Sequence, residues 1–158
     1  LRRLLAQYYE ELSRDYVTGA YNRRYLVESW LPRHEGAGIG IALIRVKEYA
    51  QICREYGRDA ADCCLNTAAG ILQRAAGADP EQVLLVRLED GVFLLAGECP
   101  GAKLASDVRE AMDGSRRIFN ISLSRRGEFS VAVASADWAE TGNWDLLLSL
   151  AEQRLVTA

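Results

Sequence analysis

Apolar and polar residues follow one another along the chain with a period that changes between that of a helix and that of a strand. In the first block, apolar residues recur at helical spacing: Leu1, Leu4, Leu5, Tyr8 and Leu12. Residues 1–14 are therefore predicted to form an amphipathic N-terminal linker helix. Its apolar stripe packs either on the rest of the domain or, as a coiled-coil lead-in, on a second copy. So short a segment leaves both options open.

Beyond this helix, short apolar runs typical of strands alternate with one-sided helical segments. The predicted strands cover residues 41–46, 83–88, 92–96, 118–123 and 129–134, and the predicted helices cover residues 47–55, 61–76, 103–112 and 144–155. The Asp90-Gly91 pair is a strong hairpin signal, and Asn143 is a suitable N-cap for the last helix. The last two strands are predicted to pair across a polar turn. This pattern predicts an α+β sandwich of the α/β class, in which helices flank a sheet of about five strands.

Composition and charge narrow the function. The 158 residues fit one domain, and 19 Lys and Arg against 22 Asp and Glu give a net charge of −3. That balance disfavours nucleic acid or a membrane surface as the partner. No apolar run reaches the length of a membrane span. Because the chain begins within a helical pattern, we expect a fragment of a longer cytoplasmic protein, or the cytoplasmic part of a membrane-anchored one.

The cysteines and the single histidine suggest no metal site. The cysteines lack a C-x-x-C spacing and are expected to be reduced, mostly buried thiols: Cys53, Cys63, Cys64 and Cys99. His34 lies near glycines and has no metal-binding partners in the sequence, so it is predicted to lie on the surface.

Two motifs resemble those of a known family. Residues 15–26 read D-Y-V-T-G-A-Y-N-R-R-Y-L and resemble the D-x-L-T-G-L-x-N-R-R-x-L that opens GGDEF domains, the diguanylate cyclase fold. Residues 87–93 read R-L-E-D-G-V-F and stand where R-Y-G-G-D-E-F belongs, without an insertion. The resemblance implies a GGDEF domain over residues 15–158, with a βααββαβ order and a mainly antiparallel sheet. It also implies a role in bacterial cyclic di-GMP signalling.

The same resemblance implies that the reagents of the cyclase reaction are missing. Family members join two GTP molecules, one on each subunit of a pair, with divalent metal held by acidic side chains. Other residues occupy the positions of the Asp that ends the first strand, of the next Asp of that motif, of the guanine-reading Asn and of the acidic pair of the signature: Arg45, Lys47, Cys53, and Gly91 with Val92. Asp62, at a position that contacts the guanine edge, is retained.

A cationic side chain at the position of a metal-binding Asp strongly disfavours binding of the metal ion. A unit charge about 4 Å from a divalent ion interacts by about 2 kcal/mol in water and by about 8 kcal/mol at an effective dielectric of about 20. Arg45 turns that attraction into comparable repulsion. We therefore predict no bound metal, no cofactor and no diguanylate cyclase activity.

Glu89 and Asp90 do not replace the lost carboxylates. Arg87 and Phe93 keep the spacing of the signature, and a one-residue slip would turn the buried faces of the strands outward. The two acidic residues are therefore predicted to be solvated in a turn. The R-x-x-D product-inhibition motif of the family is also missing, because Pro80 and Val83 stand at its positions.

Two functions remain open. The first is an inactive regulatory module that acts in dimerisation, through the N-terminal helix, or in docking to a protein partner. The alternative is a sensor that binds GTP or cyclic di-GMP without metal, in a pocket remodelled around Asp62, Arg45, Lys47 and Cys53. Direct membrane contact by this fragment is not expected.

Overall fold

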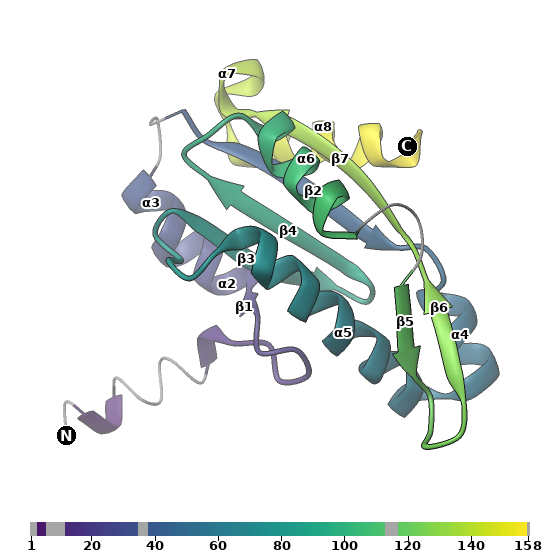
Figure 1. The fold of residues 1–158 in the computed structure, drawn as a ribbon. Coiled ribbons are helices and arrows are strands. Elements are labelled where there is room, and N and C mark those ends of the chain that lie inside the picture. The colour runs from purple at the N-terminus through teal and green to yellow at the C-terminus, as the bar shows by residue number, and fades with distance from the viewer. Residues whose placement is uncertain (1–2, 6–11, 35–37, 113–116, 158) are drawn as a thin grey trace.

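A five-stranded mixed sheet lies between two layers of helices in the computed structural model, which describes residues 3–5, 12–34, 38–112 and 117–157 (Figure 1). The strands are β1 (Tyr21–Asn22), β2 (Gly40–Val46), β3 (Val83–Glu89), β4 (Val92–Gly97), β5 (Arg117–Asn120), β6 (Arg126–Phe129) and β7 (Val131–Asp137). The helices are α2 (Arg23–Tyr25), η1 (Leu26–Trp30), α3 (Leu31–His34), α4 (Tyr49–Tyr56), α5 (Arg58–Ala76), α6 (Gly101–Met112), α7 (Trp138–Thr141) and α8 (Trp144–Val156).

The main sheet has the strand order β1-β3-β4-β2-β7. Only the β1–β3 pair is parallel, whereas β3–β4, β4–β2 and β2–β7 are antiparallel. From β2 to β7, the strands of the main sheet and their helices follow the predicted βααββαβ order, with the separate strands β5 and β6 inserted before β7. The predicted mainly antiparallel sheet flanked by helices is confirmed.

Each face of the sheet has its own apolar core. Alternate residues of β2 supply both: Ala42, Ile44 and Val46 face α5 and α6, whereas Ile41 and Leu43 face α8 and η1. The strand is buried on both faces, which explains why it reads as a continuous apolar run. The exposed exception is Arg45, near the strand's end.

The predicted pairing of strands 118–123 and 129–134 is wrong. Instead, β5 pairs with β6 in a separate two-stranded ribbon, and β7 joins the main sheet beside β2. The predicted strand is interrupted at Ser130, whose carbonyl accepts a hydrogen bond from the backbone N–H of Lys47 (3.0 Å). The Ser130 N–H donates to the carboxylate of Glu48 at 2.9 Å. These non-local bonds divide the predicted strand in two.

The helical segment from Arg23 to His34 was not predicted. Its middle part, η1, has the wider turns of a π-helix, and its buried side chains are Leu26 and Trp30, followed by Leu31 in α3.

The surface prediction for His34 is also wrong, because the residue is only 9% exposed. Its ring stacks on that of Trp30 with centroids 4.0 Å apart. The ring nitrogens lie 2.7 Å from a Glu98 oxygen and 2.8 Å from a Glu81 oxygen. Both carboxylates are distant in sequence, so the local glycines gave no sign of them.

The predicted linker helix lies partly outside the described residues. Residues 3–5 and 12–13 are helical, and Leu4 and Leu5 are 67% and 61% exposed. No helix in the described ranges is both long and apolar enough to cross a membrane.

Candidate functional site at the β3–β4 turn

The turn between β3 and β4 carries the signature positions: Glu89, Asp90, Gly91, Val92 and Phe93. It is the predicted hairpin. Asp90 has a φ of 37°, in the left-handed region that Asp adopts more readily than most residues. Glu89 and Asp90 are exposed, whereas Phe93 is buried. The carboxylates of the turn therefore lie in solvent, and its aromatic anchor lies in the core.

Arg87 ties this turn to the loop that precedes β1. Its Nη1 lies 3.1 and 3.2 Å from the two carboxylate oxygens of Asp15. Its Nε and Nη2 donate to the carbonyl of Asp90, at 3.2 and 3.0 Å. The Asp15 carboxylate also accepts bonds from the backbone N–H and the hydroxyl of Thr18, at 2.9 and 2.7 Å. Burial opposes ionisation of Asp15, but these bonds from Thr18 and Arg87 outweigh it and lower the pKa of Asp15.

Gly91 leaves no space for a side chain. Its carbonyl accepts a bond from the backbone N–H of Val46 at 2.8 Å, which holds the turn against the end of β2. A Cβ added to Gly91 would lie 2.8 Å from Cβ and 2.9 Å from Cγ of Tyr49. Burial raises the pKa of Tyr49, and so does its hydrogen bond with Cys53. A carboxylate at position 91 therefore requires Tyr49 to move.

Arg45 on β2 is paired with Val92 on the neighbouring strand β4. Its side chain lines a cavity of about 220 Å³ together with Glu89, Glu152 and Leu155. In the described part of the chain, no group of three or more His, Cys, Asp or Glu side chains is arranged to hold a metal ion. The chemistry at this point is that of an exposed cation beside two carboxylates.

The proposed nucleotide-binding residues lie on two faces of the sheet. Arg45 belongs to the face covered by α8, because it shares its cavity with α8 residues. Cys53 on α4 and Asp62 on α5 are half-buried on helices of the opposite face. Lys47 is exposed in the turn between β2 and α4. The hypothesis of one pocket around these four residues stays a prediction.

Sequence reasoning missed Glu48 and Tyr49, which follow Lys47. The Glu48 carboxylate holds Ser130, and Tyr49 covers Gly91. Each contact joins segments that are far apart in the sequence. The unusual acidic residue after an apolar strand was the available signal for Glu48.

The sequence also matches the model of a known protein family. The sequence model described as "Diguanylate cyclase, GGDEF domain" matches residues 12–158. The chain belongs to the GGDEF domain family. Its signature turn and its Asp15–Arg87 pair lie within the matched range. None of the curated proteins compared with the chain matches it.

Several solved GGDEF domains have this fold. The GGDEF domain of FimX from Pseudomonas aeruginosa is 19% identical, with a TM-score of 0.78, over 92% of this chain and 93% of that one. The coiled coil and GGDEF domain of DgcB from Caulobacter crescentus, solved with c-di-GMP, is 19% identical, with a TM-score of 0.82, over 98% and 84%. Diguanylate cyclase SiaD from Pseudomonas aeruginosa, solved with its activator SiaC, is 20% identical, with a TM-score of 0.77, over 99% and 61%.

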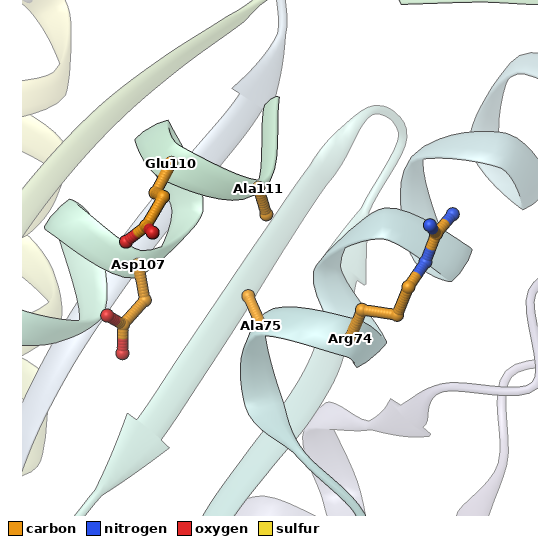
Figure 2. Close-up of a pocket in the computed structure, with 5 residues that line it drawn as sticks. All are labelled: Arg74, Ala75, Asp107, Glu110 and Ala111. Atoms are coloured by element: carbon orange, nitrogen blue, oxygen red, sulfur yellow. The ribbon is translucent and has the colours of Figure 1, made fainter. Parts of the chain in front are cut away.

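A second hollow of this GGDEF domain lies between α5 and α6, with a volume of about 340 Å³. Figure 2 shows Ala75 and Ala111 pointing toward one another across it, whereas the guanidinium of Arg74 is turned away. Asp107 pairs with Lys103 at 3.0 Å. This hollow has a floor of small residues and no converging polar groups, so we assign it no function.

Proposed function

We propose that this GGDEF domain makes no cyclic di-GMP and is a regulatory module of a bacterial signalling protein, acting in dimerisation or in contact with a protein partner. Two residues carry the proposal: Arg45, near the end of β2, and Tyr49, which begins α4 and packs on the turn. Arg45 offers a cation where metal chemistry needs carboxylates, and Tyr49 fills the space of a side chain at Gly91.

The magnitude of this change supports inactivity. A cation about 4 Å from a divalent ion is repelled by several kcal/mol at an effective dielectric of about 20. Glu89 and Asp90 are exposed in the turn, and Arg87 donates hydrogen bonds to the Asp90 carbonyl, which hold the backbone of the turn in place. The turn is therefore held in its present register.

The proposal of an interaction role rests on the N-terminal segment. Leu4 and Leu5 are exposed on helical turns, and Leu12 is 42% exposed. Exposed leucines favour contact with another protein surface. The similar DgcB structure contains a coiled coil as well as a GGDEF domain, and the similar SiaD structure contains an activator protein. Both support a module that works through protein contacts.

The activity is tested by incubating the full chain with GTP and magnesium or manganese and separating the products by chromatography. We expect no cyclic di-GMP while an active cyclase, assayed in parallel, converts its substrate. Product formed in proportion to the amount of this protein would overturn the proposal.

Self-association is tested separately by sedimentation velocity. The double variant Leu4→Asn with Leu5→Asn should sediment as a smaller species than the unmodified chain at the same concentration. Leu146→Asn on α8 is the matched control, because Leu146 is 58% exposed but lies far along the chain from the linker. Unchanged sedimentation of the double variant would contradict a role of these leucines in dimerisation.

A further inference from the structure

A third hollow, of about 500 Å³, lies where three separate segments meet. Its walls include Asn22 and Arg23 at the start of α2, Arg58 at the start of α5, and Glu89 with Asp90 in the hairpin turn. Arg45, Lys47, Cys53 and Asp62 are not among its lining residues. The hollow is therefore distinct from the pocket predicted around those four residues.

Four arginines line this hollow, and two of them are already engaged. Arg87 is bound to Asp15 and to the carbonyl of Asp90. Arg24 pairs with Glu28 at 3.0 Å on the surface of the helix.

Arg23 and Arg58 differ from these two. Within the described ranges, the side chain of neither residue takes part in a hydrogen bond or an ion pair. Their guanidinium groups are therefore free to bind a ligand.

We propose that this hollow is a metal-independent site for a small polyphosphate anion, bound by Arg23 and Arg58. Guanidinium groups match phosphate oxygens in pairs of parallel charge-assisted hydrogen bonds. Arg24 and Arg87 are already paired with carboxylates, so Arg23 and Arg58 are the two cations of this hollow that a polyanion can pair with directly. The volume lies in the range of about 300–1,000 Å³ that is usual for small-ligand sites. The inference goes beyond the proposed function and does not depend on it.

The carboxylates at the rim predict the direction in which their removal changes the affinity for a polyanion. Glu89 and Asp90 are exposed, and no ion pair joins them to Arg23 or Arg58 in the described part of the chain. Asp15 is neutralised by Arg87 at 3.1 Å. The two rim carboxylates repel a polyanion, so Glu89→Gln or Asp90→Asn should tighten its binding. Weaker binding in these variants would overturn the proposal, because the carboxylates would then be ligand contacts.

The main experiment is calorimetric titration of the full chain with pyrophosphate in the presence of EDTA. Arg23→Gln and Arg58→Gln should each weaken binding by about tenfold or more. Arg109→Gln on α6 is the charge-matched control, since Arg109 is exposed and does not line this hollow. No binding of pyrophosphate, loss of binding with EDTA, or an equal loss in Arg109→Gln would each overturn the site.

A second arm identifies the source of the phosphates. The same titration is made with a nucleoside diphosphate in place of pyrophosphate. Equal affinity assigns the site to the polyphosphate group itself, and tighter binding assigns it to a nucleotide. Both results support the site if Arg23→Gln and Arg58→Gln weaken them, and insensitivity to both variants contradicts it.

Discussion

Gly91 and Tyr49 show how one residue can limit a whole site. The turn packs so closely on Tyr49 that an added Cβ would come within 2.8 Å of the tyrosine Cβ. This contact joins residues on different elements, and nothing in the local sequence pattern indicates it. The sequence showed that a carboxylate is missing at position 91, whereas the structure shows that its space is filled.

Gly91→Asp should lower the free energy of unfolding by about 1–3 kcal/mol, because it forces extra atoms into a packed contact. Chemical denaturation measures the change. Adding Tyr49→Ala to Gly91→Asp should recover part of the loss, as residues in contact are energetically coupled. Gly70→Ala is the control: nothing lies within 4 Å of its added Cβ, on the exposed side of α5, so it should stabilise. A Gly91→Asp variant as stable as the unmodified chain would contradict the packing argument.

The Asp15–Arg87 pair predicts a dependence of stability on pH. Hydrogen bonds from Thr18 and Arg87 hold the pKa of Asp15 below its usual value of 3.8, despite partial burial. A lowered pKa in the folded state adds stability above the unfolded pKa, and this stability is lost as the pH falls through the folded pKa. Asp15→Asn should therefore cost about 1–3 kcal/mol near neutral pH. The difference from the unmodified chain should shrink in acid.

Urea denaturation at neutral pH and below pH 4 provides the measurement for Asp15. The control is Glu110→Gln, an exposed carboxylate on α6. An Asp15→Asn penalty that stays constant down to the lowest pH would show that the ion pair is not its source.

Among the helices and strands, those whose turns and caps depend on neighbouring residues were predicted correctly from the sequence. Asp90-Gly91 marked the hairpin, and Asn143 caps α8 by accepting a bond from the N–H of Asp145 at 2.8 Å. The segment 23–34 was missed because its helix changes from α to π geometry and back and contains Pro32. The break at Ser130 was missed because it depends on a hydrogen bond to Glu48, which lies 82 residues earlier in the sequence. Long-range polar contacts leave little trace in a hydrophobic pattern.

His34 is the element-scale contact with the largest expected effect. It joins α3 to the segments that precede β3 and follow β4, and its side chain is 10% exposed. His34→Ala should lower the free energy of unfolding by about 1–3 kcal/mol, because it removes a stacked ring, leaves Glu98 without this partner and leaves Glu81 with Arg33 alone. Arg33 also pairs with Glu81, but both side chains are nearly half-exposed, at 46% and 47%.

Arg33→Ala is thus the matched comparison for His34→Ala and should cost less than about 1 kcal/mol. Thermal or urea unfolding of both variants gives the ranking. Equal losses in the two variants would show that burial does not determine the strength of this cluster.

For the whole molecule, the proposed inactivity rests on residues from separate elements. Gly91→Asp with Val92→Glu returns two carboxylates to the turn, but Arg45 on β2 remains across the sheet from position 92. The cation should pair with the new carboxylates and exclude metal. We expect no manganese binding by calorimetry and no cyclic di-GMP from this double variant. Addition of Arg45→Asp should restore metal binding but only poor turnover, because Cys53 does not read guanine. Cyclic di-GMP synthesis by the double variant alone would contradict this account.

The Arg87 clamp also has a mechanical consequence. Asp15 lies at the end of the N-terminal segment, and one side chain grips both its carboxylate and the backbone of the hairpin turn. A pull applied before residue 15 is thus shared between this contact, which leads to the turn, and the Arg14–Tyr21 bridge, which leads to β1. The Arg87 side chain thereby connects the entry of the chain to the rim of the third hollow. We expect part of a load on the N-terminal segment to reach Glu89 and Asp90 through this side chain.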